Sequence, residues 1–281
     1  MKGHFISREQ IEEFKRFLQS EEKSPATIEK YIRDLLVYMA FVSEAEITKQ
    51  LVIDYKQKLI SAGYAPRSIN SMLASLNSFF NWQEWYELRV KAIKLQQEVF
   101  RPEEKELTKE EYERLCAAAE KKDNERLSLI IQTICGTGIR VSELVNITVE
   151  AVRKGEATVS CKGKTRTIFI VKALQKKLLF YARKQNISNG PIFITRNGNP
   201  MSRTTIWREM KAICKEINVN PQKVFPHNLR HLFARVFYAI EKDIAKLADI
   251  LGHSSINTTR IYIISTGKEH RQRMERMRLV C

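Results

Sequence analysis

A segment without hydrophobic periodicity, residues 96–106 (QQEVFRPEEKE), separates two parts of the chain that have different patterns. Its charged composition and its proline, Pro102, are typical of a linker. Chains longer than about 250–300 residues usually divide into domains, so this break constrains the fold of a 281-residue chain more than any other feature. We predict one domain over residues 1–95, a linker over 96–106 and a second domain over 107–281.

The first part carries helical signals alone. Ser7 and Gln10 have the spacing of a capping box, and Ser24 precedes a proline, Pro25, at a first helical position. Further apolar stripes at helical spacing begin near residues 48 and 66. Three aromatic side chains after the last stripe are assigned to the core: Trp82, Trp85 and Tyr86. Four or five short helices of this kind predict a small helical bundle.

The second part is mixed. Two β-rich runs, Ala157–Cys161 and Arg166–Val171, flank a Lys-Gly-Lys-Thr turn and predict a hairpin. Helical periodicity surrounds it, near residues 109–121, 126–134, 139–146, 172–185, 203–217, 227–239 and 243–250. The fold class is therefore mainly α with a small β-hairpin, in a helical domain followed by a mixed α/β domain.

Charge is distributed unevenly between the two parts. Residues 1–100 hold 14 basic and 13 acidic side chains, whereas the rest of the chain holds 34 and 19. A strongly basic second part favours a polyanionic partner, either nucleic acid or an anionic membrane surface. No apolar run reaches the roughly 18 residues needed to span a bilayer, so we expect a soluble cytoplasmic protein. The five cysteines are widely spaced, which excludes a disulfide framework or zinc motif.

Several polar side chains near element boundaries could perform chemistry on a phosphodiester. Arginine donates bidentate hydrogen bonds to phosphate, histidine and lysine transfer protons, and tyrosine is a nucleophile. Each side chain alone has an ordinary structural explanation, as a solvated charge or a core residue. Together they suit phosphoryl transfer without a metal or cofactor, and we expect neither. The candidates are Arg140, Lys162, Lys164, His227, Arg230, His253 and Tyr262.

Three ordered motifs resemble the signature boxes of the tyrosine recombinases, the phage integrase family. The first is Gly136–Leu144 (GTGIRVSEL), and the second is Pro226–His231 (PHNLRH). The third runs from Leu251–Ser254 (LGHS) to Thr258–Tyr262 (TTRIY). The resemblance covers residues 107–262 by motif and implies a helical core-binding domain over residues 5–95, in the simple two-domain layout of Xer-like members.

The resemblance implies a role for each matching position. Tyr262 would attack the scissile phosphate and form a 3′-phosphotyrosine, while Arg140 and Arg230 would hold the non-bridging oxygens. The hairpin lysine would be the general acid for the leaving 5′-hydroxyl. Lys162 matches that position best, and Lys164 stays open because the turn is one residue shorter than in close relatives.

The remaining matches concern the two histidine boxes and one carboxylate. His227 would exchange a proton with the tyrosine, and His253 would hydrogen-bond the phosphate. Glu143 would orient the site, and His231 would be a structural or supporting residue.

The expected partner is double-stranded DNA. Candidate contacts are Lys30, Arg33, Arg67, Arg203, Arg208, Lys211 and Lys215. The resemblance implies a monomer in solution and a homotetramer on paired sites, joined by C-terminal segments, with a nucleoid-associated location and no membrane. It implies site-specific integration, excision or inversion for a mobile element. Two alternatives are a topoisomerase-like nicking-closing enzyme and a non-catalytic DNA-binding regulator on the same scaffold.

Overall fold

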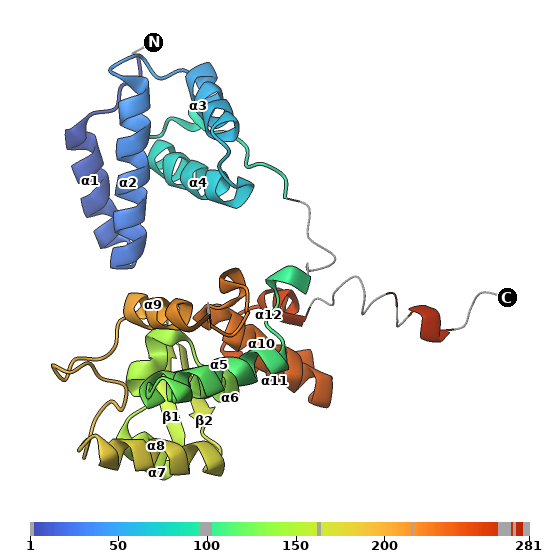
Figure 1. Ribbon diagram of the computed structural model, residues 1–281. Helices are drawn as coiled ribbons and strands as arrows, with labels where there is room; N and C mark the ends of the chain where they lie inside the picture. Colours follow the sequence, from blue (N-terminus) through green and yellow to red (C-terminus); the bar gives the residue numbers. More distant parts are fainter. Residues whose placement is uncertain are drawn as a thin grey trace. The chain divides into compact units, whose positions relative to one another are not determined.

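The computed structural model describes residues 3–95, 103–161, 164–214, 216–263, 271 and 274–277. The chain divides into two compact units, Met1–Gln97 and Glu98–Cys281 (Figure 1). Within the described residues, no helix is both long and apolar enough to cross a bilayer.

The first unit is a bundle of four helices, coloured blue to cyan in Figure 1. They are α1 (Arg8–Ser20), α2 (Pro25–Val42), α3 (Lys49–Ser61) and α4 (Pro66–Trp82), followed by a 3-10 turn, Tyr86–Leu88. The predicted helix starts are confirmed: Ser7 and Gln10 form both bonds of a capping box, and Ser24 accepts the backbone N–H of Thr27. These caps satisfy N–H groups that a helix leaves without an internal partner.

Aromatic rings fill the core of this unit. Phe14 and Phe79 meet edge to face with their centroids 5.4 Å apart, and Phe79 contacts Trp85 in the same way at 5.9 Å. The prediction that all three late aromatics are core residues is wrong for Tyr86, whose side chain is 52% exposed. Tyr86 begins the 3-10 turn after α4, and the Arg89 guanidinium lies over its ring.

The second unit packs its helices around α6 (Glu125–Thr137), most of whose residues are buried. Other elements in this unit are α5 (Lys109–Lys121), η3 (Val141–Asn146), α7 (Val149–Lys154), α8 (Lys172–Lys184), α9 (Arg203–Cys214), η4 (Pro221–Lys223), α10 (Pro226–Glu241), α11 (Ile244–Leu251) and α12 (Ile256–Ile263). The strands β1 (Glu156–Cys161) and β2 (Lys164–Phe169) form an antiparallel pair in register from Glu156 opposite Phe169 to Cys161 opposite Lys164.

One local prediction differs from the structure of this unit, and two of its helices were not predicted. Residues 141–146 form a 3-10 helix, η3, rather than an α-helix. The short helix α7 escapes periodicity analysis because six residues span fewer than two turns, although Thr148 caps it and Gly155 ends it. Helix α12 also escapes, since its Asn, Thr and Thr residues favour helix weakly and the burial of its own Thr259 and Tyr262 stabilises it instead.

Replacing Phe79 with alanine tests the aromatic core of the first unit. Phe79 is fully buried, so Phe79→Ala should lower the free energy of unfolding by about 3–5 kcal/mol. Urea unfolding of the full chain, followed by the fluorescence of Trp82 and Trp85, measures the loss. Tyr86→Ala removes an exposed ring and should change stability by less than about 0.5 kcal/mol. Equal midpoints for the two variants would contradict this description of the core.

Candidate active site

The sequence motifs converge at the C-terminal end of α6, next to two glycine turns that are far apart in the sequence. Gly138 ends α6 in the left-handed conformation with φ +66°, and a Cβ there would lie 2.5 Å from Cδ1 of Phe233. Gly252 ends α11 in the same conformation with φ +64°. Both positions therefore require glycine. The first turn leads into Arg140 and the second into His253. The carbonyl groups of Gly138, Leu251 and Gly252 accept hydrogen bonds from the arginines of the site.

Arg230, on α10, is the most deeply buried charge of the site. Its side chain is 2% exposed. Its Nη1 donates to the carbonyl of Gly138, and its Nη2 donates to the carbonyl of Leu251 at 2.6 Å. Burial, and then the charge of Arg140, lowers the pKa of Arg230 to about 10, so the group stays cationic at neutral pH. Its buried Nε has no hydrogen-bond partner among the described residues, which leaves a charged donor available to an anion.

Arg140 lies at the entrance to η3 and is more exposed than Arg230. Its Nη1 donates to Oε1 of Glu143 at 2.9 Å, and its Nη2 donates to the carbonyl of Gly252 at 3.3 Å. The two arginines therefore bind adjacent carbonyls, those of Leu251 and Gly252. Two guanidinium groups fixed this close together form a site for a phosphate, because each donates hydrogen bonds in a planar fork.

Glu143 connects Arg140 to a residue that the sequence analysis missed. Arg166, on β2, donates from Nη2 to Oε2 of Glu143 at 2.8 Å, and its side chain is 10% exposed. A signal for Arg166 exists in the sequence. Arg166 stands two residues before Ile168 and four before Ile170, which are both buried. Because every second side chain of a strand points to the same face, this spacing places the charged Arg166 on the inner face.

His253 bonds through both ring nitrogens. Its Nε2 lies 3.1 Å from Nη2 of Arg230, and its Nδ1 lies 2.8 Å from Oγ1 of Thr259. A guanidinium group only donates, so Nε2 accepts and the neutral ring carries its proton on Nδ1. Burial, and then the charges of Arg230 and Arg140, lowers the pKa of His253 to about 4. Thr259 is fully buried and is a second residue that the sequence analysis missed.

Tyr262, on α12, lies among three imidazole rings. Its ring stacks on His231 with centroids 4.0 Å apart and planes at 17°. The ring centroids of His227 and His253 lie 5.3 Å and 5.1 Å from that of Tyr262. Tyr262 is 6% exposed, and it acts to raise the pKa of Arg230 against the larger effect of burial. The structure thus brings together Arg140, His227, Arg230, His253 and Tyr262, with Glu143 and His231 beside them.

The predicted lysines lie at the end of the hairpin. Lys162 is outside the described residues, and Lys164 begins β2 without a described side chain. Arg166 nevertheless fixes the strand that follows them beside the arginine site, since it bonds to Glu143.

The predicted DNA-contacting residues differ in their surroundings. Arg67, Arg203 and Arg208 are exposed. Lys30 is instead directed inward, where its ammonium pairs with the buried Asp34 and donates to Ser75 Oγ at 3.3 Å. These partners favour a structural role for Lys30.

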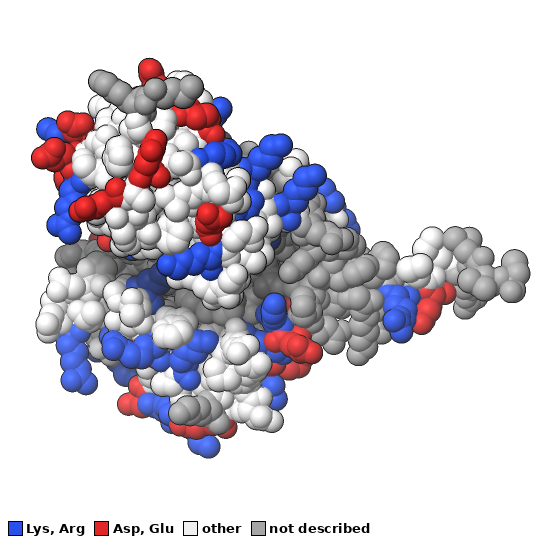
Figure 2. Space-filling view, turned by 90° about the horizontal axis from the view of Figure 1, so that it is seen from above, with Lys and Arg blue, Asp and Glu red and all other residues white. Residues whose placement is uncertain are grey.

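The other predicted contacts lie on α2 and on or after α9. Arg33 lines a groove with Leu36 in the first unit. Lys211 donates to the carbonyl of Pro221 and lies over the ring of Trp207. Lys215 is outside the described residues. Figure 2 shows lysine and arginine side chains in several groups on one face of the molecule, with acidic side chains among them.

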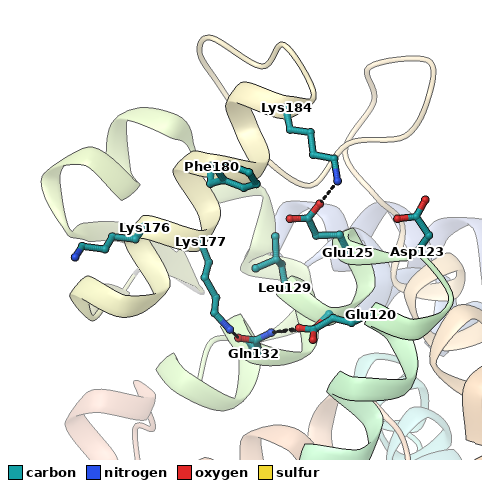
Figure 3. Close-up of a pocket in the computed structure, with 10 residues that line it drawn as sticks. Glu120, Asp123, Glu125, Leu129, Gln132, Lys176, Lys177, Phe180 and Lys184 are labelled. Atoms are coloured by element: carbon teal, nitrogen blue, oxygen red, sulfur yellow. Dashed lines mark hydrogen bonds and ion pairs between the residues drawn. The ribbon is translucent and has the colours of Figure 1, made fainter.

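A cavity of about 610 Å³ lies among α5, α6 and α8, and it contains none of the predicted site residues (Figure 3). Some of its polar side chains bond to one another: Lys184 pairs with Glu125 at 2.8 Å, and Lys177 donates to the amide oxygen of Gln132 at 2.8 Å. Across the part of the chain that the structure describes, no cluster of three acidic, histidine or cysteine side chains could hold a metal ion.

Comparison with known proteins gives two family matches. Residues 105–269 match the phage integrase family, and residues 11–87 match the phage integrase N-terminal SAM-like domain. The tyrosine recombinase XerA of Pyrococcus furiosus is 32% identical, with 100% of this chain and 98% of the relative covered. The tyrosine recombinase XerD of Halalkalibacterium halodurans is 29% identical, with 90% and 91% covered.

Solved structures are similar in fold. The crystal structure of XerA recombinase matches with a TM-score of 0.55 and 24% identity, over 97% of this chain and 99% of the other. A lambda integrase(75-356) dimer bound to a COC′ core site matches with a TM-score of 0.76 and 18% identity, over 94% and 97%.

The protonation of His253 can be tested by NMR of the full chain with labelled histidine. The ring should titrate near pH 4, well below the usual 6.5, because burial and two arginines oppose its positive charge. Arg140→Ala removes one of these charges and should raise the pKa. The unfolded chain binds this proton at higher pH than the folded chain does. The free energy of unfolding should therefore fall as pH drops from about 6.5 to 4. A ring that titrates at 6.5 in both proteins would refute the hydrogen-bonded tautomer.

Proposed function

This chain belongs to the phage integrase family and is a site-specific DNA recombinase, and we propose that it cleaves and rejoins strands through a 3′-phosphotyrosine formed on Tyr262. One observation carries the proposal: the buried guanidinium of Arg230 bonds to His253, whose ring lies 5.1 Å from that of Tyr262, and Arg140 binds the carbonyl next to one that Arg230 binds. A nucleophile next to two phosphate-binding groups is what transfer to tyrosine requires.

The proposed reaction assigns each of these residues a step. The Tyr262 oxygen attacks phosphorus, the bond from phosphorus to the 5′-oxygen breaks, and the phenol proton passes to His227. Arg140 and Arg230 hold the non-bridging oxygens, whose negative charge grows in the five-coordinate transition state. The departing 5′-oxygen takes a proton from Lys162, or from Lys164 if the shorter turn shifts that role. A 5′-hydroxyl of another strand then reverses the steps, so the diester is restored without a metal or cofactor.

His253 changes its partner when the phosphate binds. In the free chain its Nε2 accepts from Arg230, which holds the ring neutral. When Arg230 turns its donors to a phosphate oxygen, Nε2 loses that bond, and the added negative charge raises the pKa of the ring. Protonated at Nε2, His253 then donates to the phosphate, and Thr259 continues to accept from Nδ1.

Double-stranded DNA is the substrate, and two faces would bind its backbone. The exposed Arg203 and Arg208 on α9 and Arg67 at the start of α4 are suited to phosphate contacts. Strand exchange needs two paired sites, so the active form would be a homotetramer assembled on DNA from monomers by C-terminal segments. Residues 264–281 lie largely outside the described residues. Such an enzyme would be cytoplasmic and associated with the nucleoid.

Covalent trapping tests the nucleophile. A nicked duplex lets the short cleaved strand diffuse away, so the wild-type chain should accumulate a protein–DNA adduct that survives SDS. Tyr262→Phe lacks the attacking oxygen and should give no adduct while binding DNA as tightly. An adduct formed by Tyr262→Phe would refute the assignment, and a wild-type chain that binds but forms none would indicate a regulator. Religation with no exchange between two sites would indicate a topoisomerase-like enzyme.

Substrate chemistry identifies the general acid. Lys162→Ala should slow cleavage by about 10²–10⁴-fold, because the 5′-oxygen is a poor leaving group without a proton. A sulfur in place of that bridging oxygen needs no proton, so the same variant should then cleave near the wild-type rate. Lys164→Ala is the matched control and should cleave both substrates normally. Rescue confined to Lys164→Ala would transfer the role to Lys164.

A further inference from the structure

Arg166 lies beside the candidate site without belonging to any of the three signature motifs. It projects from β2 and donates twice to Glu143, from Nη2 to Oε2 at 2.8 Å and from Nη1 to Oε1 at 3.4 Å. Its Nε donates to the carbonyl of Ile250 at 3.2 Å, in the last turn of α11. One side chain therefore connects the hairpin, η3 and α11, which are far apart in sequence.

We propose that Arg166 is a positioning residue for strand cleavage. It holds Glu143 and the turn before His253 in place, and its positive charge neutralises part of the negative charge that Glu143 places next to Arg140. This proposal rests on the phosphotyrosine function proposed above, because it concerns the site that would bind the scissile phosphate.

The first argument concerns charge. Glu143 is 5% exposed and receives bonds from the Arg140 backbone N–H and Nη1, at 2.9 Å each, besides those from Arg166. Paired with Arg140 alone, this carboxylate would cancel much of the attraction of Arg140 for a phosphate. With Arg166 present, two guanidinium groups share this one carboxylate, and with Arg230 nearby the site keeps a net positive charge. The charge of Arg166 also helps to lower the pKa of Arg230 and of His253, so its field reaches the centre of the site.

The second argument concerns geometry. A Cβ on Gly252 would lie 2.6 Å from Cδ of Arg166, so the aliphatic stem of this arginine packs directly on the glycine turn. The carbonyl of Gly252 accepts from Nη2 of Arg140, and His253 is the next residue. Arg166 thus supports the backbone that positions two of the catalytic groups. A lysine could not replace it fully, because one ammonium cannot reach both Glu143 and the Ile250 carbonyl in the fixed directions of a guanidinium fork.

Single-turnover cleavage of the nicked duplex by the full chain, at saturating protein, tests the proposal. Arg166→Ala should cleave about 10²-fold more slowly, with a DNA dissociation constant within a few-fold of wild type. Arg166→Lys keeps the charge but not the fork and should recover part of the rate, to about 10-fold below wild type. Arg153→Ala removes an exposed arginine on α7 and is the matched control, with an unchanged rate.

A neutral substrate separates charge from general loss of structure. With a methylphosphonate at the scissile position, less negative charge develops, so the penalty of Arg166→Ala should shrink to about 10-fold or less. Equal penalties on both substrates, or a wild-type rate for Arg166→Ala, would overturn the proposal. If Arg166→Ala does not fold by circular dichroism, Arg166→Lys decides, and a wild-type rate would overturn it. Absence of an adduct with the wild-type chain would instead refute the proposed function.

Discussion

The active end of the second unit depends on keeping one guanidinium group charged inside the protein. Arg230 is 2% exposed, and removing such an ion from water costs several kcal/mol unless polar groups replace the solvent. The carbonyls of Gly138 and Leu251 do so, and each belongs to the end of a helix, where carbonyl groups lack partners within the helix and carry partial negative charge. The two glycine turns, the placement of α10 between them and the route of the chain to Arg140 and His253 are consequences of this requirement.

Burial of the charge also explains the neutral histidine. A cation at His253 would face Arg230 at 3.1 Å. The neutral ring instead accepts a hydrogen bond from Arg230 and donates one from Nδ1 to Thr259. The free site therefore concentrates positive charge on arginines, which cannot lose it at neutral pH, and keeps His253 neutral. In the proposed reaction, an incoming phosphate would supply the missing negative charge.

Sequence reasoning predicted most of the helices and the convergence of the motifs, and its failures have physical causes. Caps such as Ser7 and Ser24 are local, so the helix starts in the first unit could be predicted from neighbouring residues. Helix α12 could not, because its burial against other helices outweighs its weak propensity. The roles of Arg166 and Lys30 depend on partners far away in the sequence, Glu143 and Ser75, and a single chain read alone contains no record of such pairings.

Helix α6 runs through the middle of the second unit, and its last turn supplies a carbonyl to Arg230. Side chains such as Ile130 and Ile134 take no part in the reaction, but they are fully buried, and their packing fixes the position of that turn. A small packing defect there would displace the carbonyl by a fraction of an ångström long before the domain melted. A genetic screen for variants that lose strand exchange only at raised temperature should therefore recover substitutions of buried apolar residues along this helix.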